Sequence, residues 1–392
     1  MIKDRRTLSV LLCALSVFLA GVIDAKSQDN GLRRATLPTV NGTAFTSGPV
    51  TVDRTHCGWN YALGGGGFYF ANVGRASDFL QGCTITITNT DVSACKGKSI
   101  QVAGFQDRFV LWPGQTVELT NVANAWMETI TPGRWRPICG GDPLIINADA
   151  TKGSDLRGDS DGLGSGIEAF QSVQFALQHV LTDFDFAGTP QTRVKILMAA
   201  GSVDSITVHY TPHASNPGSQ GGAALTIDGN GGSLTGGAEF YFGAIVQIRN
   251  VTLSNASGSC LVSTQNAYVE INDLVTFGAC AGPHIAIGTY GTVELFNDFT
   301  ISGSARNFVE NLGGTLREDG GIIRLVNDIT FSGAVISAFY PGLTNLQAAR
   351  WALDGHTVTA QKYDVEANHV LTGAADIPGR IAGKTATGGQ AF

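Results

Sequence analysis

The sequence predicts an all-β protein whose larger part is a right-handed parallel β-helix, a solenoid with an N-terminal capping helix. A small β-sandwich-like domain is expected to precede it. Three observations predict this fold. The 392 residues include 51 glycines without a Gly-X-Y period, which suits many tight turns between short strands. Strand-like segments recur with a period in the twenties, and an amphipathic segment comes just before them.

The repeat is the strongest of these observations. Four segments share the order strand, Asn/Asp bend, strand, and they begin at Val246, Val269, Val293 and Ile323. Their equivalent threonines are Thr252, Thr276, Thr300 and Thr330, at intervals of 24, 24 and 30 residues. One such unit cannot bury its own apolar residues, so successive units must stack. We expect the four starting residues to form one inner column, and Ile248, Ile271, Leu295 and Leu325 to form the next.

The bends of the repeat carry amide and carboxylate side chains. These are Asn250, Asp273, Asn297, Asp298, Asn327 and Asp328. Such side chains satisfy the backbone groups of tight turns, so we expect a structural ladder here, with a catalytic role as the alternative.

The rest of the chain divides by pattern. Residues 49–138 hold short alternating segments such as Thr84 to Thr88, which predict the β-sandwich-like domain. Residues 139–165 are a Gly/Asp-rich connection, and residues 26–48 are a linker. Apolar residues at helical spacing predict one helix over 166–182, where it covers the open end of the first turn of the solenoid. Residues 166–392 are thus expected to form the capping helix, the parallel β-helix and its C-terminal tail.

The N-terminus has the pattern of an export signal. Lys3, Arg5 and Arg6 precede an apolar run from Leu8 to Ile23, and Ala25 offers a cleavage point. We expect residues 1–25 to be a signal peptide and the protein to be secreted, with an uncleaved anchor and a buried helix as alternatives.

Cysteine usage agrees with export. Six cysteines remain once Cys13 leaves with the signal, and an even number in an exported chain predicts disulfides. Cys260 and Cys280 are 20 residues apart, close to one turn of the solenoid, and are expected to pair. Three pairings stay open among Cys57, Cys83, Cys95 and Cys139. No Cys/His cluster has metal-ligand spacing, so we expect no metal and no cofactor.

One group of residues could carry chemistry. If the first column points inward, the next residues point outward and stack into an exposed column of Gln247, Glu270, Glu294 and Arg324. Glu270 and Glu294 could divide the work of acid and base because repulsion between stacked carboxylates separates their pKa values. Gln247 and Arg324 would then bind substrate. The alternative is an ordinary solvated face. A net charge of −7 and a pI near 5.5 argue against nucleic acid as a partner.

Two segments carry a resemblance. Gly166-Ile-Glu-Ala-Phe-Gln-Ser-Val-Gln174 and Val194-Lys-Ile-Leu-Met-Ala-Ala200 resemble the entry to pectate-lyase-like β-helices. Residues 109–117 and 378–389 resemble phage tail or prophage-encoded β-helix proteins, although a secretory signal departs from that pattern. The resemblance implies a structural or adhesion protein that binds surface polysaccharide, or else a glycoside hydrolase or polysaccharide lyase. It also implies a homotrimer, phage tail components as partners, and the virion as the alternative location.

Overall fold

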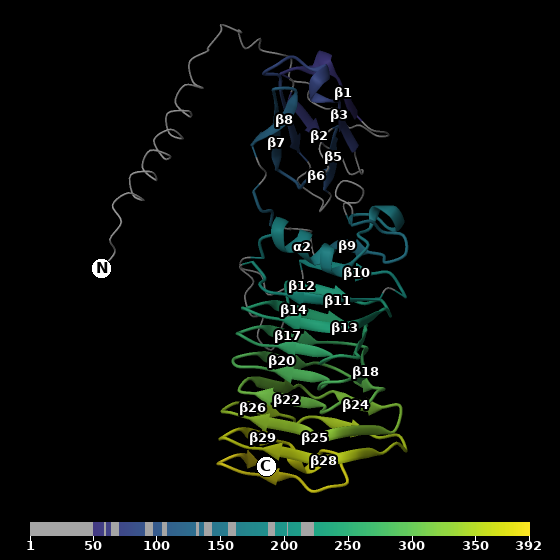
Figure 1. Ribbon diagram of the computed structural model, residues 1–392, viewed down its shortest axis with the longest axis vertical. Coiled ribbons are helices and arrows are strands. Elements are labelled where there is room, and N and C mark those ends of the chain that lie inside the picture. The colour runs from purple at the N-terminus through teal and green to yellow at the C-terminus, as the bar shows by residue number, and fades with distance from the viewer. Residues whose placement is uncertain are drawn as a thin grey trace, which may run out of the picture.

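The computed structural model describes residues 50–58, 60–63, 70–90, 97–103, 108–130, 133–136, 143–155, 162–186, 193–201, 203–212 and 223–392. The expected signal peptide 1–25, the linker 26–48, Cys95 and Cys139 lie outside this part of the chain. The protein is mostly β, and its body is a parallel β-solenoid of about 12 turns. Figure 1 shows the strands stacked along one long axis, with the C-terminus at the far end.

One face of the solenoid is a ten-stranded sheet, called here the first column, in which every described pair is parallel. Its strands are β9 (Leu144–Ala148), β10 (Val194–Met198), β12 (Leu225–Asp228), β14 (Ile245–Arg249), β17 (Tyr268–Ile271), β20 (Thr292–Leu295), β23 (Thr315–Glu318), β26 (Leu343–Asn345), β29 (Val370–Thr372) and β31 (Gln390–Ala391). The stack therefore begins at β9, inside the stretch that the sequence predicts as a connection.

A thirteen-stranded sheet forms the remaining faces. It starts with β11 (Val203–Val208) and β13 (Ser233–Phe240), and β13 pairs with a strand of each of two further columns. The second column is β15 (Thr252–Asn255), β18 (Val275–Cys280), β21 (Phe299–Ile301), β24 (Ile322–Leu325) and β27 (Arg350–Ala352). The third is β16 (Leu261–Ser263), β19 (Ile285–Ile287), β22 (Val309–Leu312), β25 (Ile329–Phe339), β28 (Val358–Val365) and β30 (Lys384–Thr385).

The inner columns follow the prediction up to Val293 and then depart from it. Val246, Val269 and Val293 are in register and fully buried, but Leu316 follows them instead of Ile323. Ile323 is also buried, but it lies in the second column opposite Phe299. The period explains the error. Leu316 comes 23 residues after Val293, close to the preceding steps, whereas the segment from Ile323 is 30 residues on.

The other equivalent positions of the repeat also depart from the prediction at the segment that begins at Ile323. Leu325 lies opposite Ile301 in the second column, so it does not continue Ile248, Ile271 and Leu295. Thr252, Thr276 and Thr300 form a true column, which Arg324 continues. Thr330 lies on β25 opposite Thr359 and is not equivalent to them.

A short helix covers the N-terminal end of the solenoid. α2 (Val173–Asp183) contacts β9, β10 and β11 and buries Val173, Ala176, Leu177 and Val180. The expected cap is present, but it is shorter than residues 166–182. Ser172 caps the helix by accepting from the N–H of Phe175, and Ile167 is 77% exposed in a separate 3-10 turn. Among the described residues, no helix is long and apolar enough to cross a membrane.

The N-terminal part has two four-stranded sheets. One holds β1 (Val50–Val52), β3 (Phe70–Val73), β5 (Lys98–Val102) and β6 (Arg108–Leu111), and the other holds β2 (Asn60–Leu63), β4 (Thr84–Asn89), β7 (Thr116–Val122) and β8 (Ala125–Ile130). They share one cluster of buried residues, as a sandwich does. The pairing is mixed, however, because β1–β3–β5 and β2–β4 are parallel. The region therefore differs from the all-antiparallel pairing of a typical β-sandwich.

Candidate functional site

The predicted outward column exists for three of its four residues. On the outer side of the first column, Gln247 lies opposite Glu270, and Glu270 lies opposite Glu294. The next residue in the register is Arg317, whose Nη1 is 3.3 Å from Glu294 Oε1. Arg324 lies on β24 in the other sheet, where it pairs with Asp354, so its placement in this column is wrong. The cause is the same as for Ile323: the segment that begins there belongs to the second column, and Arg324 is part of it.

These side chains are buried, although the sequence predicts an exposed column. Glu270 is 1% exposed, Glu294 5% and Gln247 7%. Two donors meet Oε2 of Glu270: Gln247 Nε2 at 3.0 Å and the backbone N–H of Ala223 at 3.2 Å. Tyr268 donates its hydroxyl to Glu294 Oε2 at 2.6 Å, and the same hydroxyl lies 3.3 Å from Glu270 Oε1. The column is therefore a hydrogen-bonded network beneath the surface.

Burial dominates the electrostatics of this network. Desolvation raises the pKa of Glu270 from 4.5 to about 7, and the hydrogen bonds from Ala223, Gln247 and Tyr268 only partly oppose it. Repulsion from Glu294 is the smallest contribution, so the expectation that repulsion sets the pKa is wrong in its cause. Desolvation also raises the pKa of Tyr268. Glu270 has the pKa of a general acid, but its side chain presents almost no surface to a substrate.

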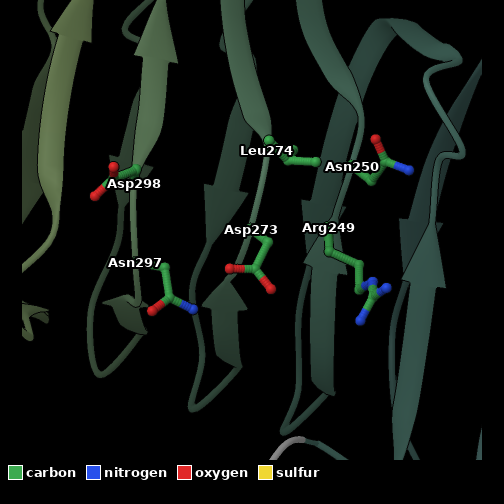
Figure 2. A pocket seen from close by; sticks show the side chains of 6 residues that line it. All are labelled: Arg249, Asn250, Asp273, Leu274, Asn297 and Asp298. Carbon is green, nitrogen blue, oxygen red and sulfur yellow. The ribbon is translucent and has the colours of Figure 1, made fainter.

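A depression of about 560 Å³ lies beside this network, at the edge where the first column passes to the second. It is lined by residues of three successive turns: Arg249, Asn250, Asp273, Leu274, Asn297 and Asp298. Figure 2 shows their polar side chains around the hollow. The row of these turns is called here the Asn/Asp turn. Four of its residues belong to the ladder that the sequence predicts.

The ladder works by bonds between neighbouring rungs. Asn297 Nδ2 donates to Asn272 Oδ1 at 2.8 Å, and Asp298 Oδ1 accepts the N–H of Ile322 at 2.9 Å. Asp328 accepts both the N–H and the hydroxyl of Thr357. Within the described chain, by contrast, the carboxylate of Asp273 has neither a hydrogen bond nor an ion pair, and this residue is exposed. Asp273 is therefore free to accept hydrogen bonds from a ligand.

Arg249 and Leu274 are the lining residues that the sequence did not single out. Arg249 Nε lies 3.1 Å from Asp228 Oδ2, which holds the guanidinium beside the depression. Leu274 is 72% exposed and has a φ of 61°. A left-handed conformation costs a branched residue roughly 1–2 kcal/mol, and such strain clusters at functional sites. The signal in the sequence is a leucine at a bend where Asn and Asp stand in the other repeats.

The cysteines form a second chemically notable group. Cys260 and Cys280 are joined as a disulfide with Cα atoms 5.8 Å apart, and Cys57 joins Cys83. Potential ligand atoms of Cys260, Cys280 and His284 all lie within 4.8 Å of one another, a spatial cluster that sequence spacing did not reveal. Cysteine binds a metal as a thiolate, so the disulfide leaves only His284 of this group as a possible ligand, and its Nε2 already lies 2.9 Å from the carbonyl oxygen of Gly278. Burial lowers the pKa of His284 to about 4.

Comparison with known proteins adds no family: no family model, no curated protein and no solved structure matches the chain. The fold defines the class of the protein, a parallel β-solenoid.

Proposed function

We propose that the protein is an exported, non-enzymatic β-solenoid that binds a surface polysaccharide at the Asn/Asp turn. The observation that carries the proposal is the depression of about 560 Å³, lined by carboxylate, amide and guanidinium groups around an exposed leucine. Small-ligand sites combine apolar surface with a few convergent polar groups, and this lining has both.

Each lining group has a task that suits a sugar. The carboxylate of Asp273 accepts hydrogen bonds from sugar hydroxyls, because it has no partner of its own in the described chain. Arg249 donates to hydroxyl or carboxylate oxygens while Asp228 holds it in place. Leu274 offers an apolar surface to the C–H face of a pyranose ring. Because the turns repeat along the axis, one chain of sugars can meet equivalent groups on successive rungs.

Binding is favoured over cleavage by the burial of the acidic pair. A glycoside hydrolase needs two carboxyl groups in contact with the sugar bond. Glu270 is 1% exposed and already receives hydrogen bonds from Gln247 and Ala223. The alternative of a hydrolase or lyase therefore lacks an accessible acid at this position.

Export is supported by the disulfides. Cys57–Cys83 and Cys260–Cys280 are both closed, and disulfides persist in oxidising compartments. An adhesion role outside the cell fits this chemistry.

The test is binding to a panel of immobilised neutral, amino and uronic polysaccharides, with reducing-end release measured in parallel. The double variant Asp273→Asn, Asp298→Asn should weaken binding at least about tenfold, since hydrogen bonds to a charged group contribute roughly 1.5–3 kcal/mol. Asp319→Asn is the matched control, because this exposed aspartate lies one rung further on and outside the lining. If Asp319→Asn weakens polysaccharide binding as much as the double variant does, or if the double variant binds normally, the proposed site is contradicted. Release of reducing ends that Glu270→Gln abolishes would contradict the non-enzymatic role.

A further inference from the structure

Besides Tyr210, which is 49% exposed in the turn after β11, three further aromatic side chains stand exposed along the opposite edge of the first column. Phe242 is 59% exposed, Tyr290 72% and Tyr340 61%. Each lies in a turn that leads into a first-column strand. The turn of Phe242 follows β13, and those of Tyr290 and Tyr340 follow third-column strands. The row of these turns is called here the aromatic turn. Its outward surface is separate from the depression, which lies at the other ends of the same strands.

The register places the three rings on alternate rungs. The N–H of Gly243 donates to the carbonyl of Gln265 at 3.1 Å, and that of Gln265 to the carbonyl of Thr289 at 2.9 Å. The N–H of Tyr290 then donates to the carbonyl of Gly313 at 3.2 Å. A Cβ placed on Gly313 would lie 3.5 Å from Cβ of Tyr340, so the rung of Tyr340 is the next one.

From Phe242 onward, the order along the axis is therefore aromatic, glutamine, aromatic, glycine, aromatic. Neighbouring strands are roughly 4.8 Å apart, so successive aromatic positions are separated by about 10 Å. Aromatic residues at these positions strain the backbone. Phe242, Tyr290 and Tyr340 have φ values of 48°, 61° and 66°, in the left-handed region that Gly313 occupies in the same row at 92°. Glycine or asparagine would meet this requirement with less strain, so bulky rings here point to a role outside the fold.

We propose that the aromatic turn is a stacking platform for a linear polysaccharide of β-linked pyranose units that runs along the solenoid axis. This inference rests on the proposed polysaccharide-binding function but uses a second surface. The C–H faces of β-linked pyranoses are flat and alternate along an extended chain, so a ring at every second sugar is the matching arrangement. Two rungs span about 10 Å, close to the length of two such sugars.

The polar residues between the rings fit the same ligand. Gln265 and Asn266 are exposed on the rung between Phe242 and Tyr290, where their amides can reach sugar hydroxyls. Gly313, between Tyr290 and Tyr340, carries no side chain and leaves room for a substituent on the glycan. At the N-terminal end the platform widens. His209 stacks on Tyr241 with ring centroids 5.4 Å apart, and Phe242 lies 6.0 Å from His209.

The test is titration calorimetry with linear β-1,4-linked oligosaccharides of glucose, N-acetylglucosamine, mannose and xylose, each as a disaccharide and a hexasaccharide. A hexasaccharide reaches all three rings and a disaccharide one. Each added ring should tighten binding by roughly 2- to 10-fold. For the sugar that binds best, the hexasaccharide should therefore bind at least about fourfold more tightly than the disaccharide. α-1,4-Linked maltohexaose is the ligand control, because its helical chain cannot lie flat on the row.

The variants separate stacking from folding. The double variant Tyr290→Asn, Tyr340→Asn removes both rings, so the tighter binding of the hexasaccharide should vanish. Asparagine tolerates the left-handed conformation, so the melting temperature should stay level or rise. Tyr290→Phe with Tyr340→Phe should retain the tighter binding. Leu80→Asn, at an apolar residue that is 76% exposed in the N-terminal part, should retain it as well.

Several outcomes would overturn the platform: no hexasaccharide binds, length brings no gain, or the asparagine variants keep it. Dissociation of an oligomer in the asparagine variants, without any effect on glycan affinity, would make the row a self-association surface instead. If only the double variant Asp273→Asn, Asp298→Asn loses affinity for the glycan, the platform is contradicted and the proposed function stands. If only the Tyr290→Asn, Tyr340→Asn variant loses affinity for the glycan, the depression is not the binding site and the platform stands.

Discussion

The first column has two buried sides, and they are buried for different reasons. On the inner side, Val246, Val269 and Val293 are fully buried because identical positions of successive rungs pack on one another. On the outer side, Glu270 and Glu294 are almost as buried, but hydrogen bonds from Tyr268, Gln247 and Ala223 satisfy them. The inner side needs only the repeat, whereas the outer side also needs Ala223, a residue that precedes β12 and lies 47 positions before Glu270.

The difference teaches how each side should respond to perturbation. Apolar burial does not depend on protonation, so the inner side should lose stability equally at every pH. A buried carboxyl depends on its proton, so the outer side should change with pH. Three substitutions in the first column test this contrast, and a fourth tests a buried ionisable group elsewhere in the core; they are given from the largest expected effect to the smallest.

Ile271→Ala tests the inner side and should have the largest effect. Ile271 is fully buried between Ile248 and Leu295, and removing its side chain should lower the free energy of unfolding by about 2–5 kcal/mol. Urea denaturation at pH 5 and pH 8 should give the same loss at both values. A loss below that of the exposed control Leu80→Ala would contradict the stacked inner column.

Glu270→Gln tests the outer side. The pKa of Glu270 is about 7 in the folded chain and 4.5 as its ordinary value, so the folded state holds the proton more tightly. Stability from this group is complete below pH 4.5 and falls as the pH rises to 7, by about 3 kcal/mol at most. Glutamine has no proton to lose, so the variant should lack this slope and exceed the wild type at pH 8. Glu168→Gln, at an exposed site, should keep the slope.

His284→Phe probes the one ionisable group described among Phe277, Phe308 and Phe331 in the core. Burial lowers the pKa of His284 from 6.5 to about 4, so the folded state resists protonation. Its contribution is complete above pH 6.5 and is lost as the pH falls, by about 2 kcal/mol at pH 5. In the variant, the free energy of unfolding should no longer fall in this way as the pH is lowered below 6.5. An unchanged decline in the variant, or its disappearance in the surface control His356→Phe, would show that another group is responsible.

Arg317→Ala should have the smallest effect. The Arg317 side chain is 59% exposed where it meets Glu294, and exposed ion pairs contribute about 0–1 kcal/mol. We expect a loss within this range at low salt and almost none at high salt, measured by urea denaturation. A loss as large as that of Ile271→Ala would mean that the outer network depends on Arg317 far more than its exposure suggests.

Much of the fold could be predicted from local pattern. Alternation from Thr84 to Thr88 predicted β4, and Ile85 and Ile87 are fully buried there. The spacing of Val173, Leu177 and Val180 predicted the cap. The helix start was wrong because Ile167 has helical spacing but lies before the capping Ser172, and spacing alone does not show where a helix begins.

The candidate site was less predictable. Gln247, Glu270 and Glu294 could be assigned to one outward column because strand periodicity fixes which side a residue faces. Their burial could not be predicted, since it depends on contacts with a distant part of the chain. The aromatic turn left a trace in the sequence: Phe242 and Tyr290 are each followed by a glycine, and Tyr340 by Pro341-Gly342. Their alignment on alternate rungs required the register.

The sequence by itself determined the repeat, the inward residues up to Val293 and the capping helix, because period and polarity are local properties of the chain. Only the tertiary structure decided the rest. It continued the column through Leu316 and Arg317, moved Arg324 to another sheet, and enclosed Glu270. The physical reason is that turns of unequal length shift the register of a solenoid. Which residues become neighbours is then decided by hydrogen bonds between rungs, and not by distance along the chain.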